Sequence, residues 1–165
     1  MILAGHEPYP AVIVDRLWNL VLANAAALSL FATDVAPHLL EPPVNVVRLG
    51  VHPEGLAPRT RNLAEFSEHL LIRLQRQLVV SPDPELQALY DEVLGYPGVG
   101  SQSPVVADPT TLLFVPMQFV APDGRELSMF STLATFGTAL DITLAELSIE
   151  SFFPADDATE AFFRT

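Results

Sequence analysis

The sequence contains no cysteine and no lysine among its 165 residues. Without cysteine the chain has no disulfides, thiol nucleophiles or thiolate metal sites, which fits the reducing cytoplasm. Without lysine it has neither Schiff-base chemistry nor the lysine-dependent loop that binds nucleotide phosphates. The sequence also lacks a nucleophile elbow, a zinc-binding helix motif and a glycine-rich dinucleotide loop. We therefore expect a protein that is not an enzyme and that needs no cofactor.

Positive charge is scarce as well. Arginine is the only strong base, and eight arginines face 20 acidic residues, for a formal net charge of −12. The arginines are scattered from Arg16 to Arg164, whereas binding to phosphate backbones depends on clustered basic side chains. We expect no direct contact between this chain and DNA.

Long hydrophobic runs are missing too. The best candidate, residues 20–32, is too short to cross a membrane and is interrupted by Asn24 and Ser29. The N-terminus does not place a basic segment before an apolar one, which argues against a secretory signal. We expect a cytoplasmic protein without a membrane partner.

Apolar residues nevertheless make up 50% of the chain. Such a share indicates an unusually large buried surface, an apolar cavity or a subunit interface. The length fits one domain, which we expect to span residues 1–165.

The first part of the chain predicts a β-hairpin and a helix. Residues 11–15 and 18–23 are apolar and β-prone, with a polar turn at Asp15 and Arg16 between them. Asn24 occupies the position of an N-cap before the alanine-rich residues 25–32. A proline-rich loop at residues 37–43 and one or two helical turns at residues 44–51 should follow.

Two amphipathic helices come next. Asn62 and Glu65 have the spacing of a capping box, and leucines and Phe66 continue at helical spacing as far as Leu78. Asp83 and Pro84 predict the start of a second helix, which should end at Gly95. Residues 96–109 read as a linker within the domain.

The last part is rich in strand-forming residues. We expect a long hairpin from residues 111–121 and 126–136, with its turn at Asp123 and Gly124. Between residues 146 and 153, Leu147 and Ile149 alternate with Ser148 and Glu150, which predicts one buried and one wet face. The predicted fold class is α+β, a PAS-like five-stranded antiparallel sheet with helices inserted between strands two and three.

Several segments also carry a family resemblance that spans nearly all of residues 6–157. The sequence resembles the C-terminal ligand-binding domain of MmyB-like transcription regulators. The segments are residues 6–11 (HEPYPA), 14–16 with Trp18, 52–56 (HPEGL) with Pro58 and Arg59, 96–99 (YPGV), 130–132 (FST), 135–138 (TFGT), Asp141, 143–147 (TLAEL) and 149–156 (IESFFPAD).

This resemblance implies a PAS-like sensor that follows an N-terminal helix-turn-helix domain. It also implies a fatty-acid-like small molecule as the ligand class. Residues 1–5 are too few to form a helix-turn-helix domain, so we expect DNA to be bound only through a domain outside this chain.

A pocket for an apolar ligand should lie between the sheet and the helices. Its polar mouth is expected at His52 and Arg48, where the guanidinium could pair with a ligand carboxylate, with Arg59 and Arg61 as rival anion partners. For His52 by itself a structural role is the favoured explanation, with the imidazole holding the turn at Gly55. The expected apolar lining is Phe66, Leu70, Met117, Phe119 and Met129.

The strand predicted at residues 126–136 carries many hydroxyls. One face presents Ser131, Leu133 and Thr135 with Met129, and the other presents Phe130 and Phe136 among further residues. Neither face is clearly wet, so we expect the strand to be buried on both. Its hydroxyls then either face a polar ligand group or bond locally, and local bonds are the favoured explanation.

Three function classes follow. The favoured one is a small-molecule sensor in a transcription regulator, and the second is a dimerisation module without a ligand. A metal-dependent enzyme is a remote third, which would require His52, Glu54 and His69 to meet around a metal ion. A homodimer is expected, because operators are commonly read by two-fold symmetric regulators.

Overall fold

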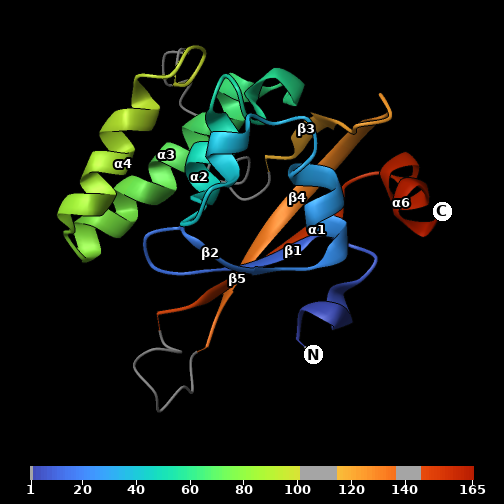
Figure 1. Ribbon diagram of the computed structural model, residues 1–165, viewed down its shortest axis with the longest axis horizontal. Helices are drawn as coiled ribbons and strands as arrows, with labels where there is room; N and C mark the ends of the chain where they lie inside the picture. Colours follow the sequence, from blue (N-terminus) through green and yellow to red (C-terminus); the bar gives the residue numbers. More distant parts are fainter. Residues whose placement is uncertain (1, 101–114, 137–145) are drawn as a thin grey trace.

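A five-stranded antiparallel sheet organises the chain (Figure 1). The computed structural model describes residues 2–100, 115–136 and 146–165. The strands are β1 (Ala11–Val14), β2 (Leu20–Ala23), β3 (Met117–Val120), β4 (Glu126–Thr135) and β5 (Ser148–Pro154), in the order β2-β1-β5-β4-β3.

Helices separate the second strand from the third, as predicted. They are α1 (Ala25–Phe31), α2 (Val46–Val51), α3 (Leu63–Val80) and α4 (Pro84–Leu94), with the 3₁₀ turns η2 (Pro37–Leu40) and η3 (Ala57–Arg59). The α+β class and the antiparallel sheet are therefore confirmed, and the strand order is consistent with a PAS-like arrangement. None of the helices described combines the length and apolar character needed to span a membrane.

The core lies between the sheet and these helices. Its fully buried side chains include Phe119, Met129, Leu74 and Leu86. On the opposite face of the sheet, Tyr9 packs against Phe153. The segment before β1 therefore covers sheet residues that the helices α1 to α4 do not reach.

Two elements near the ends of the chain were not predicted. The 3₁₀ turn η1 (Leu3–His6) opens the described chain, and helix α6 (Asp157–Arg164) closes it. Asp156 caps α6 by accepting a hydrogen bond from the Thr159 N–H, and Phe163 of α6 packs against Tyr9. An aspartate N-cap with acidic residues in the first turn was the sequence signal for this helix.

The hairpin of β1 and β2 forms, but the prediction that Trp18 begins the second strand is wrong. Trp18 adopts φ +67° at the end of the turn, and β2 starts at Leu20. Asp15 holds the turn, because its carboxylate accepts hydrogen bonds from the N–H groups of Leu17 and Asn19. A bulky residue with positive φ is strained, so the surrounding contacts must hold Trp18 in place.

Asn24 is the N-cap of α1, as predicted. Its Oδ1 accepts hydrogen bonds from the N–H groups of Ala27 and Ala11, both at 3.0 Å. Its Nδ2 donates to the carbonyl of Tyr9 at 2.8 Å. The buried amide therefore joins the start of α1 to β1 and to the segment before it.

Asn62 does not form the capping box predicted with Glu65, although α3 begins where expected. Its side chain accepts no hydrogen bond from a backbone N–H of the first turn, although its Nδ2 donates to Oε2 of Glu65 at 3.4 Å. It accepts instead from the Gln118 N–H at 2.9 Å and donates to the Pro116 carbonyl at 2.7 Å. The edge of β3 that faces away from β4 therefore binds this amide, because edge strands leave backbone groups available to other partners.

The prediction that residues 130–136 are buried on both faces is wrong. Residues 132–135 of β4 are exposed. The reason is the register: β3 begins at Met117, which lies opposite Met129, so among the described strands the rest of β4 is paired with β5 alone. In the described sheet this part of β4 is the outer strand, because β5 pairs with β1 on its other side (Figure 1).

Parts of two sequence predictions lie outside the described residues. These are the start of the first strand of the long hairpin, at residues 111–114, and residues 101–109 of the predicted linker.

Candidate functional site

An apolar pocket of about 360 Å³ lies between the sheet and the helices α1, α2 and α3. This volume is at the lower end of the range of roughly 300–1,000 Å³ that is typical of small-molecule sites. The pocket reaches the surface beside Leu28, whose side chain is 51% exposed. The described lining consists of Val12, Trp18, Leu20, Ala23, Ala27, Leu28, Phe31, Ala32, Leu40, Val44, Val46, Val47, Leu49, Gly50, Leu56, Phe66, Leu70, Met117, Glu150 and Phe152.

The sheet forms the floor of this pocket. Val12 of β1 lies opposite Ala23 of β2 and Glu150 of β5, so these three residues share the face that points at the helices. Alternation along β5 places Phe152 on the same face. The strands thus supply a flat apolar base with one carboxylate in it.

Trp18 forms part of the wall. Its indole Nε1–H donates to Oε1 of Gln77 at 2.9 Å, and the Arg73 guanidinium lies over its ring, 5.6 Å from the centroid. Both partners come from α3. This helix therefore holds the strained hairpin turn against the pocket.

Glu150 faces the pocket, so the prediction that it lies on a wet face is wrong. Its side chain is only 12% exposed, and its Oε1 lies 3.2 Å from Nη1 of Arg73. The alternation along the strand correctly indicated two different faces, but the face that carries Glu150 is the one that contacts the helices. A nearby arginine on α3 makes this placement tolerable, because buried charges need partners.

The apolar residues predicted to line a pocket divide into two groups. Phe66, Leu70 and Met117 line it. Phe119 and Met129 are completely buried in the core and are not among the lining residues. The second group supports the pocket from behind, since Phe119 packs against the lining residue Phe31 with ring centroids 5.8 Å apart.

The predicted β4 residues do not reach the pocket. Ser131 is half-buried, whereas Leu133 and Thr135 are exposed on the part of β4 beyond its pairing with β3. The hydroxyls on this exposed part of β4 can be solvated, so the burial cost that made them unusual does not arise.

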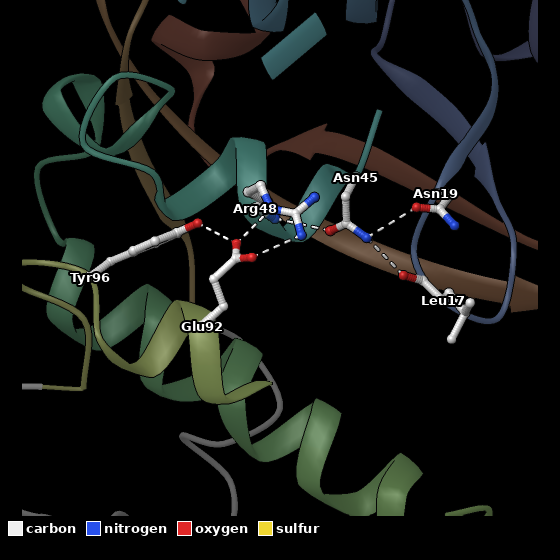
Figure 2. Close-up of polar contacts among 6 residues, drawn as sticks. All are labelled: Leu17, Asn19, Asn45, Arg48, Glu92 and Tyr96. Carbon is white, nitrogen blue, oxygen red and sulfur yellow. Dashed lines mark hydrogen bonds and ion pairs between the residues drawn. The ribbon is translucent and has the colours of Figure 1, made fainter. Parts of the chain in front are cut away.

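Arg48 lies outside the described lining of the pocket. Figure 2 shows its contact with Glu92. Its Nε and Nη2 donate to the two carboxylate oxygens of Glu92 on α4, at 2.5 and 3.0 Å. Tyr96 donates its hydroxyl to the same carboxylate. The guanidinium fork that was expected to bind a ligand carboxylate is therefore occupied by a carboxylate of the chain.

The contacts in this cluster shift the pKa values of Glu92 and Tyr96. The hydrogen bond from Arg48 lowers the pKa of Glu92 below its ordinary value of 4.5. Burial, followed by the hydrogen bond to Glu92, raises the pKa of Tyr96 to about 12. Both carboxylate and phenol therefore keep their ordinary neutral-pH forms, with Glu92 charged and Tyr96 protonated.

Replacement of Glu92 by glutamine should make stability less sensitive to acid. A carboxylate whose pKa is lower when folded stabilises the fold above its unfolded pKa, and this contribution is lost as the pH falls through the folded value. Because Glu92 is 38% exposed, we expect the loss to be below about 1 kcal/mol. Urea unfolding between pH 7 and pH 3 would measure it.

Glu41→Gln is the control, because Glu41 is exposed and forms no ion pair with any other described residue. The wild type and the control should lose stability in parallel on acidification, and Glu92→Gln should lose less. Equal acid slopes in all three proteins would refute the stabilising role of this pair.

His52 holds a turn. It is the C-cap of α2, and its Nδ1 accepts the N–H of Glu54 at 2.9 Å, while its carbonyl accepts the N–H of Gly55. Its ring also packs edge-on against Tyr96. This geometry favours the structural alternative considered for this residue.

Among the described residues, His69 does not lie with His52 and Glu54, the other two residues considered from the sequence as metal ligands. His52 and Glu54 lie near His38 rather than His69, with ligand atoms within 4.8 Å of one another. The hydrogen bond from Glu54 to Nδ1 leaves the proton of His52 on Nε2, so neither ring nitrogen offers a free lone pair. His69 lies on α3, where burial lowers its pKa.

Arg59 and Arg61 also have other partners. Arg59 lies over the Phe119 ring, 4.8 Å from the centroid, and donates to the Thr33 carbonyl beyond the end of α1 at 2.7 Å. Arg61 is exposed beside Glu126, at 3.3 Å. Neither belongs to the described lining of the pocket.

Comparison with known proteins adds one decisive finding. A family model, the MmyB-like transcription regulator ligand binding domain, matches residues 1–165, which is the whole chain. The chain belongs to this family. A search of curated proteins found no match.

Membership of the MmyB-like family gives the pocket its context. The family is defined as a ligand-binding domain of transcription regulators. The pocket between the sheet and the helices is a concave apolar site of this MmyB-like domain, and such sites are the default location for a small-molecule ligand.

Proposed function

We propose that this chain is the sensing domain of a transcription regulator and binds an amphiphilic small molecule through an alkyl chain, as a fatty-acid-like ligand would. The observation that carries the proposal is the apolar pocket, whose described lining is hydrophobic except for Gly50 and Glu150. The dimerisation module that the sequence left open would need a packed interior instead, which the pocket does not favour.

The pocket can supply a useful affinity. Burial of an alkyl chain is favourable by roughly 0.8 kcal/mol per methylene. Even a partly enclosed chain can therefore bind in the micromolar range after the costs of association. We propose that the tail provides most of the affinity and that the head group provides orientation.

A route for the signal starts at α1. Its residues Ala27, Leu28 and Phe31 line the pocket, so an occupying chain pushes on this helix. Asn24 at the start of α1 binds the carbonyl of Tyr9, and Glu7 accepts the N–H of Ala25 at 3.0 Å. Movement of α1 is thus coupled to residues 1–10, through which we propose that it reaches a DNA-binding domain outside this chain.

The test uses the single tryptophan, because Trp18 lines the pocket. Its fluorescence is recorded while octanol, decanol and dodecanol are titrated into the whole chain. We expect saturable binding that strengthens by about fourfold per added methylene until the pocket is full, as expected from about 0.8 kcal/mol for each. Absence of a saturable change, or affinity independent of chain length, would contradict the proposal.

Native mass spectrometry of the purified protein provides an independent check. A ligand retained from the expression host should appear as added mass that disappears on denaturation.

A further inference from the structure

Glu150 is the unusual residue of the pocket. It lies on β5, between β1 and β4 in the sheet, and shares a row with Val12 and Leu133 on the face that meets the helices. Among the described lining residues it is the one with an ionisable side chain. A carboxylate in such a position breaks the hydrophobic pattern of the core, and breaks of this kind are expected where a protein recognises something.

Arg73 satisfies only part of the hydrogen-bonding capacity of the Glu150 carboxylate. Among the described residues, the Glu150 side chain accepts one hydrogen bond, which Nη1 of Arg73 donates to its Oε1 at 3.2 Å. A carboxylate has two oxygens with about four acceptor positions. Arg73 is itself 37% exposed and also lies over the Trp18 ring, so its charge is shared with water and with an aromatic face. The Glu150 carboxylate can therefore accept further hydrogen bonds at the pocket wall.

The arginines expected to attract a ligand carboxylate lie outside the described lining of the pocket. Arg48 donates to both carboxylate oxygens of Glu92. Arg59 lies over the Phe119 ring and donates Nη2 to the Thr33 carbonyl, while its Nε and Nη1 are buried without a hydrogen-bond partner among the described residues. Arg73 pairs with a charged lining residue, because its Nη1 lies 3.2 Å from Oε1 of Glu150. A ligand carboxylate would therefore have to share Arg73 with a carboxylate of the protein.

These observations define a preference for the head group. A second carboxylate close to Glu150 would be disfavoured by like-charge repulsion in a site with little water. A hydroxyl, amide or amine would instead donate a charge-assisted hydrogen bond, the strong class of hydrogen bond. Resting on the proposed alkyl-chain function, we infer that Glu150 selects ligands whose head group is a hydrogen-bond donor, such as long-chain alcohols or amides, over free fatty acids.

The inference is tested by comparing decanol, decanoate and methyl decanoate at neutral pH by titration calorimetry. The three share an alkyl chain, and the ester is uncharged but has no donor. We expect decanol to bind at least about tenfold more tightly than decanoate and also more tightly than the ester, because a hydrogen bond to a charged group is worth this much. The ester thus separates the need for a donor from a simple avoidance of charge.

The variant Glu150→Gln removes the charge and keeps the shape. In it, Arg73 is freed for a ligand carboxylate, so the preference for decanol over decanoate should shrink by about tenfold. Glu92→Gln is the matched control, because Glu92 also pairs with an arginine but lies outside the described pocket lining. Its selectivity should equal that of the wild type.

The outcomes separate this inference from the function on which it rests. Equal binding of all three ligands, or tighter binding of decanoate to the wild type, would overturn the role of Glu150 and leave the alkyl-chain pocket in place. An unchanged preference in Glu150→Gln would overturn it too. Failure of all three ligands to bind would overturn both. The comparison of ligands on the wild type needs no variant, so the inference stays testable even if Glu150→Gln folds poorly.

Discussion

Replacement of Leu70 by tryptophan is expected to abolish binding of alkyl ligands while the chain remains folded. Leu70 projects from α3 into the pocket, and the larger indole would occupy the space that an alkyl chain requires. We expect at least a hundredfold loss of affinity for decanol, measured by titration calorimetry, because a filled pocket leaves no apolar surface to bury. Met117→Trp, from the sheet side of the pocket, should act in the same way.

The stability of Leu70→Trp distinguishes a pocket from a packed core. Insertion of extra atoms into a well-packed interior typically costs about 1–3 kcal/mol, whereas an open pocket accepts them with little strain. The control is Val79→Trp, on the same helix but at a position that is 83% exposed and outside the described lining. It should bind decanol normally. Normal binding by both Leu70→Trp and Met117→Trp would place the ligand elsewhere.

Replacement of Gly55 by alanine is expected to destabilise the fold by about 3 kcal/mol, near the upper end of the usual overpacking range. A Cβ at this position would lie 2.4 Å from the carbonyl oxygen of Leu49, and backbone cannot move aside cheaply. The same oxygen accepts the N–H of Leu56, so relief of the clash would break the contact that closes the turn after α2. Urea unfolding measures the change.

Gly50→Ala is the matched comparison within the same segment. Gly50 lies inside α2, and an added Cβ there meets no atom within 4 Å. Alanine should therefore stabilise the helix by roughly 0.5–1 kcal/mol, since glycine loses more backbone freedom on folding. We therefore expect alanine to change the stability in opposite directions at the two glycine positions. A Gly55→Ala protein as stable as the wild type would show that the turn is not tightly packed.

Local patterns were reliable where neighbouring residues decide the structure. The N-caps at Asn24 and Asp83 lie where the sequence placed them, because an N-cap acts on the first turn of its own helix. Asn62 failed as a capping residue because a distant partner, the outer edge of β3, offered its amide better hydrogen bonds. Sequence spacing carries no information about such competitors.

The candidate site was predicted in part, for the same reason. Helical spacing on α3 indicated that Phe66 and Leu70 are buried, and both line the pocket. The expected polar groups, Arg48 and His52, lie outside the described lining because Glu92 and the turn at Gly55 engage them. The residue missed was Glu150, whose alternation with Ile149 showed two faces without showing which one the helices cover.

By itself, the sequence determined the α+β class, the placement of the helices between the second and third strands, and the family. Hydrophobic periodicity, caps and turns act over a few residues, so they can be read along the chain. Only the tertiary structure decided that Glu150 meets the pocket, that Arg48 pairs with Glu92 and that β4 leaves the core after Met129. These features depend on strand register and on contacts between distant segments, since the register sets which face of a strand the helices cover.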